Sequence, residues 1–488
     1  MSEKTISRRK FLQDGARVLF GTAVTCLLGK FLPFEQVFAA DAAAGTDTTS
    51  LSILRDTSKC IGCGKCVELC SGRQGLDILT LKETNGRTVS ALKNASSLAE
   101  SKCIGCGQCA RHCPSGAITA KDALAEVNAA LNSSAYSYVV WQFAPSAQHI
   151  IGEEFHMLPG TDMCAKLAAA VHSLGEGNLA FSTDFGADIT IMEEATEFVQ
   201  CVEAGTKKPF MTSCCPGWVN YVELNHPELI PHLSSCKSPM EMLGALVKSY
   251  LPEQLNVSPD QIFHVAVMPC TAKKFERARA EMTTNGVRTV DAVMTVIEFK
   301  NLLLSRGIDL TSLNDGAYNN WFDGTSGAGR IFGATGGVCE AAMRTAYRLL
   351  AGEEPERIEF TELRGSAGIK TAELAIKGKT IRACVVNGIG NINSIVESIR
   401  SNTCPYDFIE VMACRGGCSG GGGTPVLFGD EGVRHRGLYR YDAGADVRFS
   451  HNNETLNALY GSYLGSPGSE LAEQLLHTHY NAGRSGTV

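Results

Sequence analysis

The sequence predicts an α/β core that follows a small cysteine-rich unit and ends in a helical tail. Apolar runs of five or six residues alternate with helical stretches from Tyr138 onward. Two similar cysteine runs begin at Cys60 and Cys103, and the pattern from Tyr439 to Tyr480 is helical. Strands that alternate with helices are typical of an α/β fold, and 488 residues suffice for two or more packed units.

Composition excludes some partners and points to metal. Apolar residues make up 44 % and charged residues 19 %, as in an ordinary globular protein. The net charge of −7 and the lack of a basic stretch argue against nucleic acid as a partner. The cysteine content is unusual: the chain has 20 cysteines. A chain of this size does not need disulfides for stability, so the close spacing of the cysteines predicts metal binding.

The N-terminus has the pattern of an export signal. Residues 7–12 read SRRKFL, a twin-arginine pattern, and an apolar run over 18–28 and a small-residue cleavage candidate at 37–39 follow it. We predict a signal peptide over residues 1–40, export of the folded chain, and a location in the periplasm or at the outer face of the cytoplasmic membrane. The alternative, an amphipathic helix with a chance arginine pair, does not explain the order of these regions. No later apolar run reaches ~18 residues, so no other membrane span is expected.

The first cysteine-rich unit, residues 50–122, contains two four-cysteine runs with the spacing C-x2-C-x2-C-x3-C. A thiolate at every third residue lets three sulfurs hold one cluster, while the fourth cysteine reaches the other cluster. We therefore assign one 4Fe-4S cluster to Cys60, Cys63, Cys66 and Cys113, and a second to Cys103, Cys106, Cys109 and Cys70. Zinc is the alternative for an isolated C-x2-C pair, but two complete runs favour iron-sulfur clusters. Residues 76–81 and 117–120 are predicted strands.

The core is expected to place functional groups on loops at strand ends. Predicted strands cover 138–143, 263–267 and 408–412, and predicted helices cover 193–202 and 240–250. The second helix is predicted to begin with Ser238 as its cap and Pro239 in its first turn.

Three further cysteine loops lie far apart in this core: 212–218 (TSCCPGW), 268–276 (MPCTAKKFE) and 412–418 (MACRGGC). Glycine, proline and small residues let the backbone approach a bulky inorganic group closely. The residues alone predict a further iron-sulfur site with one or two spare thiols beside it. Buried structural cysteine is a reasonable alternative for one such loop and a poor one for three.

These three loops resemble the signature segments of the active-site domain of FeFe hydrogenases, and the likeness covers about residues 138–480. The resemblance implies a two-lobed α/β domain over 137–433, with mixed and parallel sheets flanked by helices. It also implies a bacterial-ferredoxin-like α+β domain over 50–122 and a fused small-subunit-like helical segment over 434–488 that wraps the large domain.

By the same resemblance, one group of residues would hold the catalytic cofactor. Cys215, Cys270, Cys414 and Cys418 would bind a 4Fe-4S subcluster, bridged through Cys418 to a di-iron unit with CO, cyanide and a dithiolate amine. The implied reaction is the reversible heterolytic cleavage of dihydrogen into protons and electrons. The implied partners are dihydrogen and protons, cofactor maturation proteins, and an external redox carrier: a cytochrome, a ferredoxin or a membrane-bound acceptor.

Other residues match the family's proton route and the surroundings of its cofactor. Cys214 would hold no metal and would relay protons, since nearby charge can tune a thiol pKa toward neutrality. The route would continue through Glu194, Ser234 and Glu197, although the two glutamates could equally form a solvated helix face. Near the cofactor the matching residues are Lys273, Pro145, Ser146, Met268, Met412 and Ser238. Both methionines could also be ordinary core residues, and the two roles are compatible.

Three positions depart from the family pattern: Cys201 stands where the proton route commonly ends in arginine, and Met240 and Thr424 stand where glutamine is common. None of these removes a ligand. The remaining cysteines are expected to be small apolar packing residues: Cys26, Cys164, Cys201, Cys236, Cys339, Cys384 and Cys404. The tail is expected to be structural, and a surface metal site at His477 and His479 is the less favoured interpretation.

Three other functions compete with the hydrogenase hypothesis. An iron-sulfur assembly relative would be expected to lack Cys214 or one of Cys414 and Cys418, and all three are present. A hydrogen or redox sensor would usually carry attached signalling domains, and none is evident. A ferredoxin-type carrier explains the first cysteine-rich unit but leaves the rest of the chain unexplained.

Overall fold

The computed structural model describes residues 45–206, 208–426 and 432–483. The predicted signal peptide lies outside these residues. All elements described below belong to one compact unit within residues 43–487. Among the described residues, no helix is both long and apolar enough to cross a membrane.

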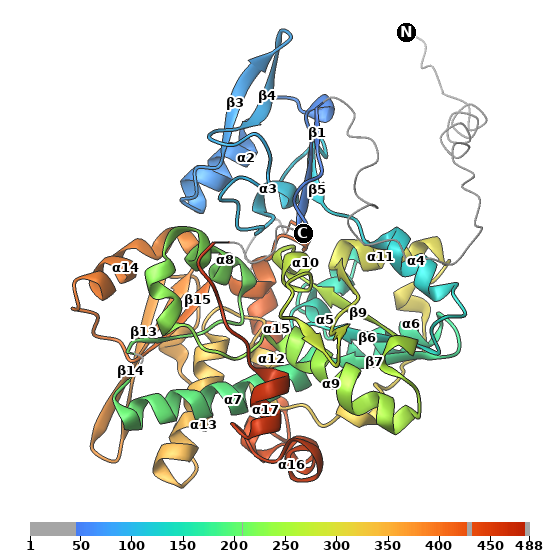
Figure 1. The fold of residues 1–488 in the computed structure, drawn as a ribbon. Helices are drawn as coiled ribbons and strands as arrows, with labels where there is room; N and C mark the ends of the chain where they lie inside the picture. The colour runs from blue at the N-terminus through green and yellow to red at the C-terminus, as the bar shows by residue number, and fades with distance from the viewer. Residues whose placement is uncertain (1–44, 207, 427–431, 484–488) are drawn as a thin grey trace. The chain divides into compact units, whose positions relative to one another are not determined.

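The cysteine-rich unit has an α+β fold with little apolar core (Figure 1). Its antiparallel sheet has the order β1 (Thr46–Asp47), β2 (Ile53–Asp56) and β5 (Ile118–Ala120), beside the hairpin β3 (Leu79–Thr84) and β4 (Arg87–Leu92). The helices α2 (Lys65–Val67) and α3 (Gln108–Arg111) are a single turn each. The main apolar cluster here contains few aliphatic side chains and several cysteines, so bound metal has to supply much of the stability.

The strand predicted over 76–81 was partly wrong, because β3 begins only at Leu79. Asp77 has a φ of 52°, a left-handed conformation that interrupts an extended run. The strand predicted over 117–120 is confirmed to within one residue by β5.

The first lobe of the core is an all-parallel sheet in the order β12 (Ala292–Thr295), β9 (Ile262–Met268), β6 (Tyr138–Phe143) and β7 (Asn178–Ser182). Helices α4 (Leu124–Leu131), α6 (Cys164–His172), α9 (Pro239–Leu255) and α11 (Val296–Ser305) pack around it. Both faces of a parallel sheet are covered, so β6 and β9 are almost fully buried, which is why their sequences are continuous apolar runs.

The second lobe is a mixed sheet in the order β13 (Ile369–Ile376), β14 (Lys379–Asn387), β15 (Phe408–Met412) and β8 (Phe210–Met211). β13 and β14 form an antiparallel hairpin, and the other neighbours are parallel. Helices α8 (Pro216–Asn225), α13 (Gly337–Ala351) and α14 (Asn393–Arg400) belong to this lobe. The predicted two-lobed α/β architecture is confirmed.

One long helix, α7 (Thr183–Ala204), packs against α9 of the first lobe and α13 of the second (Figure 1). Only its second half, 193–202, was predicted. Residues 183–195 are buried on every side, so this stretch has no polar face and lacks the periodicity that marks a helix. The helix predicted over 240–250 is confirmed, with Ser238 as its N-cap and Pro239 in its first turn, although the Ser238 side chain makes no capping hydrogen bond.

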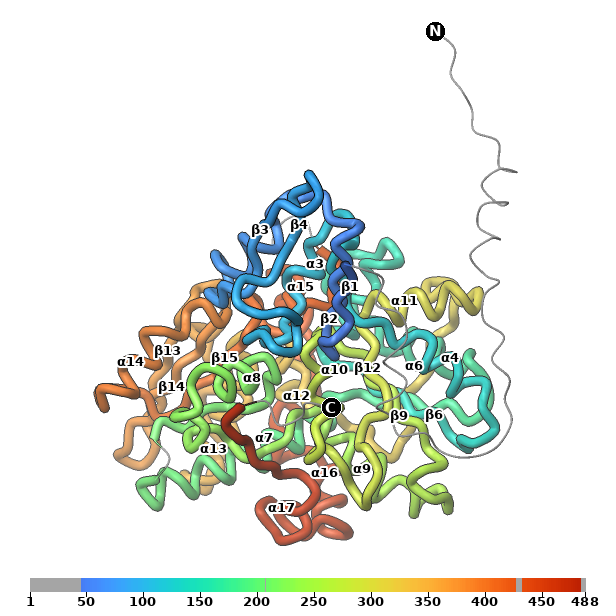
Figure 2. Tube along the Cα trace, turned by 45° about the horizontal axis from the view of Figure 1, so that its top comes forward, coloured from blue at the N-terminus to red at the C-terminus, as the bar shows by residue number. Residues whose placement is uncertain are grey.

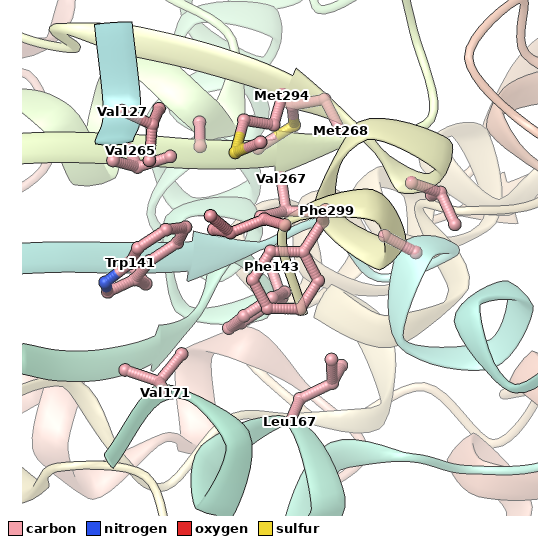
Figure 3. Packing of buried hydrophobic residues seen from close by; sticks show 14 of the residues in the cluster. Val127, Trp141, Phe143, Leu167, Val171, Val265, Val267, Met268, Met294 and Phe299 are labelled. Atoms are coloured by element: carbon pink, nitrogen blue, oxygen red, sulfur yellow. The ribbon is translucent and has the colours of Figure 1, made fainter. Parts of the chain in front are cut away.

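Aromatic packing anchors β6 and β9 where their C-terminal ends reach the site (Figure 3). The rings of Phe143 and Phe299 lie 5.2 Å apart, edge to face. Trp141 Nε1 donates a hydrogen bond to Asn178 Oδ1 at 2.9 Å, so the buried indole is satisfied. Met268, the last residue of β9, belongs to this cluster and also to the site described below.

The C-terminal tail is helical and wraps the core as expected. It comprises α15 (Gly432–Gly444), α16 (Glu454–Leu459), a π-helical turn over Tyr460–Leu464, and α17 (Glu470–Leu476). Helices α16 and α17 lie beside α7 and α9 (Figures 1 and 2). The α12 helix (Gly327–Ile331) packs against α15.

A buried ion-pair network fixes α15 to α13. The Arg344 guanidinium, with 0 % of its side chain exposed, donates to both Asp442 oxygens at 2.9 Å and to Glu340 Oε1 at 2.8 Å. A buried charge that loses its partner is costly, whereas an exposed pair contributes little.

We predict that Arg344→Leu lowers the free energy of unfolding by about 3 kcal/mol, because it removes the fully buried cation that Asp442 and Glu340 share and leaves them only the partly exposed Arg448 and Arg364. The matched control is Arg382→Leu, which breaks the exposed Arg382–Glu373 pair and should cost less than about 1 kcal/mol. Chemical denaturation of the three proteins measures the difference; equal losses in both variants would contradict the prediction.

Candidate metal centres and active-site cavity

The cysteines of the first unit line two separate cavities, in the crossed sets that the sequence predicted. Cys60, Cys63, Cys66 and Cys113 line the outer cavity. Cys70, Cys103, Cys106 and Cys109 line the inner cavity. Each cavity thus takes three thiols from one run and the fourth from the other. The geometry suits two four-thiol clusters, while the ligand roles themselves remain a prediction.

The backbone curls tightly around the outer cavity. Gly62 has a φ of +69°, and a Cβ there would lie 2.7 Å from the Thr88 carbonyl oxygen. The Ser90 amide donates to Cys60 Sγ at 3.2 Å. Such N–H to sulfur contacts are typical of the surroundings of iron-sulfur clusters. Cys63 is exposed, so this cavity lies near the surface.

The inner cavity is more deeply buried. Burial raises the pKa of Cys70 to about 11 and that of Cys106 to about 12. Thiols of this kind are protonated in the metal-free protein and ionise when a bound cation stabilises the thiolate. The chemistry of both donor sets therefore fits the predicted clusters.

A third cavity lies between the lobes, where β6, β8, β9 and β15 end and their loops begin. The loop after β8 contributes Cys214 and Cys215, the loop after β9 contributes Cys270, and the loop after β15 contributes Cys418. Three loops distant in sequence thus bring four thiols to one cavity. Ligand sites at the carboxyl ends of parallel strands are a general feature of α/β proteins.

Cys414 does not line this cavity but lies beside it. It shares an apolar cluster with Cys215. Burial raises the pKa of Cys414, and so do the neighbouring thiols of Cys106, Cys270 and Cys215. The four predicted subcluster ligands are therefore neighbours in space.

Glycines allow the loop after β15 to pack backbone against backbone. Gly417 has a φ of +67°, and a Cβ there would meet the Thr335 amide nitrogen at 2.7 Å. A Cβ at Gly421 would lie 2.2 Å from the Pro269 carbonyl oxygen. Only glycine permits these approaches, which bring Cys418 and Cys270 to one cavity.

The remaining lining is apolar apart from the cation of Lys273 and the hydroxyls of Ser146 and Thr183. Met268, Met412, Phe332, Pro145 and Met240 line the cavity with Lys273 and Ser146. Lys273 Nζ donates to Glu276 Oε2 at 2.7 Å and to the Cys214 carbonyl oxygen at 3.3 Å. The Ser146 hydroxyl is buried and has no hydrogen-bond partner among the described residues, so it can donate to a bound group.

These observations fit the cofactor that the resemblance implied. A cluster of thiols, a lysine cation and a spare hydroxyl donor suit an inorganic group with anionic ligands. Ser238 is the one predicted neighbour of the cofactor that does not line the cavity, although the adjacent Pro239 does.

The predicted proton-route residues also gather beside Cys214. Glu194 is 1 % exposed, and neither of its carboxyl oxygens has a hydrogen-bond partner among the described residues. Burial, followed by the charge of Glu197, raises the pKa of Glu194 to about 8. Ser234 Oγ donates to Glu197 Oε2 at 2.8 Å, and the Ser235 amide donates to the same oxygen at 3.0 Å.

The described residues around Cys214 do not lower its pKa, so its tuning toward neutrality by nearby charge stays a prediction. Burial raises the pKa of Cys214 well above its ordinary value, and Glu194 raises it further. The side chain is therefore a protonated thiol in this environment.

The three departures from the family pattern have different surroundings. Cys201 is partly buried against the apolar cluster that contains Phe198 and Phe210. Met240 lines the active-site cavity. The buried Thr424 hydroxyl donates to the Gly421 carbonyl oxygen at 2.9 Å and so closes its own loop.

The other cysteines only partly follow the prediction of apolar packing. Cys339 and Cys384 are fully buried in apolar clusters. Cys164 instead donates to Gln148 Oε1 at 2.8 Å, so it has a polar environment that its spacing did not reveal. Cys236 is buried, but its thiol lies 3.9 Å from Glu197 Oε2. Cys26 lies outside the described residues.

Sequence reasoning also missed two residues near the proton route. The Glu193 carboxylate accepts from the Tyr460 hydroxyl at 2.5 Å and lies 3.2 Å from His477 Nε2. His477 was treated as a surface residue of a structural tail, whereas only 6 % of its side chain is exposed. His479, in contrast, is exposed.

Hydrogen bonds join the first unit to the loops of the active-site cavity. Gln74 Nε2 donates to the Ala413 carbonyl oxygen at 2.9 Å, and Gln108 Nε2 donates to the Gly420 carbonyl oxygen at 2.8 Å. Cys414 Sγ lies 4.0 Å from the Cys106 carbonyl oxygen. The inner cavity and the active-site cavity are therefore in direct contact.

Comparison with known families identifies three matching regions. Residues 137–422 match the C-terminal domain of the iron only hydrogenase large subunit, residues 432–483 match the iron hydrogenase small subunit, and residues 59–117 match a 4Fe-4S dicluster domain. An [FeFe]-hydrogenase HydA1 structure from Chlamydomonas reinhardtii, 36 % identical, aligns with a TM-score of 0.66 over 74 % of this chain and 100 % of that one.

Similar proteins include hydrogenases and one other class. "Iron hydrogenase 1" of Clostridium pasteurianum is 40 % identical and covers 90 % of this chain and 78 % of its own length. The "Periplasmic [Fe] hydrogenase large subunit" of Nitratidesulfovibrio vulgaris is 40 % identical and covers 63 % of this chain and 73 % of its own length. The "Cytosolic iron-sulfur assembly component 3" of Bos taurus is 31 % identical and covers 70 % of this chain and 74 % of its own length.

We predict that the double variant Cys63→Ala/Cys113→Ala loses one 4Fe-4S cluster, about four iron atoms, and keeps the other. The two residues come from different runs but line the same cavity. Iron and sulfide analysis with electron paramagnetic resonance measures the loss, and Cys404→Ala is the control. Damage to both clusters, or stoichiometric zinc in the wild type, would contradict the assignment.

A second prediction concerns the pH dependence of stability. The Glu194 pKa rises from 4.5 to about 8 on folding, so the protonated carboxyl stabilises the folded state. This stabilisation is complete below the unfolded pKa and is lost as the pH rises through the folded pKa of about 8. Glu194→Gln removes this dependence. From pH 5 to pH 8 the wild type should therefore lose on the order of 4 kcal/mol relative to the variant. Chemical denaturation at both pH values measures this, and parallel curves would contradict it.

Proposed function

The chain belongs to the FeFe hydrogenase family of iron-sulfur oxidoreductases, and on that premise we propose that it interconverts dihydrogen with protons and electrons by heterolytic cleavage. The observation that carries the proposal is the cavity between the lobes. It combines the thiols of Cys215, Cys270 and Cys418 with the unassigned thiol of Cys214, next to the buried Glu194.

Four residues would hold the cofactor: Cys215, Cys270, Cys414 and Cys418. When bound through Cys418, the di-iron group supplies the metal at which dihydrogen is split. Lys273 and Ser146 offer N–H and O–H donors that orient anionic ligands. Met268, Met412 and Phe332 keep water out of the cavity, which strengthens these interactions.

The chain's own contribution to proton transfer begins at the Cys214 thiol. Because Glu194 is adjacent and has a pKa of about 8, it can take up and release a proton near neutral pH. The Ser234 hydroxyl bonded to Glu197 continues the sequence of exchangeable groups away from the cavity. We refer to Cys214, Glu194, Ser234 and Glu197 as the proton route.

Electrons would leave in another direction. Cys414, beside the active-site cavity, contacts Cys106 of the inner cavity, and Cys66 of the outer cavity shares an apolar cluster with Cys109 of the inner cavity. Exposed Cys63 marks the end at which an external carrier would dock. This external electron carrier would be a cytochrome, a ferredoxin or a membrane-bound acceptor.

We also propose that the chain is matured with its cofactor before export by the twin-arginine route, and that it works in the periplasm or at the outer face of the cytoplasmic membrane. This follows from the signal pattern at residues 7–12, since that route carries folded cargo.

A role in cluster assembly is the second candidate, because several relatives are assembly components. The cavity favours the hydrogenase function. Cys214 and Cys418 line it and Cys414 lies beside it, and this combination supports the hydrogenase proposal over the assembly role.

We predict that Cys214→Ser keeps the CO and cyanide infrared bands of the matured enzyme but loses nearly all hydrogen turnover. Serine has the same shape, but its hydroxyl is a far weaker acid than a thiol, so the relay fails. Infrared spectroscopy tests whether the cofactor bands are kept, and a hydrogen-evolution assay tests whether turnover is lost. Near-normal turnover would refute the relay, and absence of the bands in matured wild type would refute the hydrogenase function.

A further inference from the structure

The end of the C-terminal tail is joined to the segment that follows Ser234. The Lys237 amide donates to the Leu476 carbonyl oxygen at 2.9 Å, and the Thr478 amide donates to the Ser235 carbonyl oxygen at 2.7 Å. Cys236 and His477 form an antiparallel bridge between these hydrogen bonds. In Figure 1 the chain leaves α17 beside α7 and continues toward α8. The tail therefore places His477 next to the proton route.

The contacts of the His477 ring favour one tautomer. Nε2 lies 3.2 Å from Glu193 Oε2, and Nδ1 lies 2.8 Å from Ser235 Oγ. A carboxylate can only accept, so Nε2 carries the proton, and the neutral Nδ1 accepts from the serine hydroxyl. The buried Glu193 is held in turn by Tyr460 and by the Gly468 amide at 2.8 Å. The Nδ1 lone pair, which accepts from the Ser235 hydroxyl, thus lies on the side of the proton route.

Only a short gap separates this nitrogen from Glu197. The Cys236 thiol lies 3.9 Å from Glu197 Oε2 and 4.0 Å from His477 Nδ1. A carboxylate oxygen of Glu197, the sulfur of Cys236 and a ring nitrogen of His477 all lie within 4.8 Å of one another. One thiol or one water molecule can bridge such a distance.

A solvent-exposed carboxylate, that of Glu473, also lies near the His477 ring. Nδ1 lies 3.7 Å from Glu473 Oε2, and the Glu473 side chain is 56 % exposed. The charged groups around the ring are the carboxylates of Glu193 and Glu197 on α7 and of Glu473 on α17. Burial lowers the pKa of His477, but these carboxylates outweigh it, so the net shift is upward.

We propose that His477 carries protons between Glu197 and the exposed carboxylate of Glu473, so that the C-terminal tail supplies the outer end of the proton route. Nδ1 takes a proton from Glu197 through the thiol or water as the Ser235 hydroxyl turns from donor to acceptor, and it releases this proton to Glu473, while Nε2–H stays bonded to Glu193. The ring returns to its starting form, and no oxidant or reductant is consumed. The proposal rests on the proposed function.

The test compares His477→Gln with His479→Gln in the matured full-length enzyme. Glutamine keeps hydrogen-bonding atoms but cannot take up a proton, and His479 is an exposed residue on the same segment. His477→Gln should keep the infrared bands and lower turnover at least about tenfold in dilute buffer. The loss should be smaller than the ~10²–10⁴ of a group acting on reacting atoms, because His477 would act only on a proton that has already left the cavity. His479→Gln should match the wild type.

Rescue separates a relay from a structural role. Imidazole added to His477→Ala should restore turnover, and sodium chloride at equal ionic strength should not. In the holoenzyme with ¹³C-labelled histidine, the resonance missing from His477→Gln should titrate above the ~6.5 of an unperturbed histidine. Titration below that value would count against the proposal.

Glu473→Gln alters an exposed side chain, so it tests the proposal without a risk to folding. It should slow turnover in a way that added buffer reverses. If Glu473→Gln and His477→Gln both show the turnover and the buffer dependence of the wild type, the proposal is overturned. If Cys214→Ser is inactive in the same assay, the proposed function stands and only this inference falls; if Cys214→Ser is active, the proton route itself fails.

Discussion

The structure depends on the meeting of three loops at one cavity, at the carboxyl ends of strands from both lobes. The loop after β15 reaches the loop after β9 only because Gly421 lets its backbone touch the Pro269 carbonyl oxygen, and Gly417 makes the same kind of approach to Thr335. Any side chain at these positions would separate Cys418 from Cys270 and open the cavity to water. The aromatic packing behind β6 and β9 keeps those strand ends in place.

The cysteine-rich unit depends on the same loops. Its own apolar cluster is small, and it is held to the core by hydrogen bonds from Gln74 and Gln108 to carbonyl oxygens of the loop after β15. These bonds place the inner cavity against Cys414. The contacts that stabilise the unit are thus also those on which the proposed electron transfer depends.

Much of this was predictable from the sequence, for physical reasons. Buried parallel strands give uninterrupted apolar runs, so β6, β9 and β15 were predicted with correct or nearly correct bounds. The first half of α7 was missed because a helix buried on all sides has no periodicity. The crossed cysteine sets followed from spacing alone, whereas the polar environment of Cys164 depends on tertiary contacts. The place of His477 beside Ser235 joins residues 242 positions apart, and no local pattern reveals such a contact.

The central claim is that these three cavities hold iron. Diffraction at the iron absorption edge from anaerobically grown crystals of the matured protein tests it most directly. The account predicts anomalous density within the outer cavity, the inner cavity and the cavity between the lobes, with iron also beyond the Cys418 sulfur. Disulfide-bonded cysteines or zinc at these positions, or no iron beside Cys418, would contradict it.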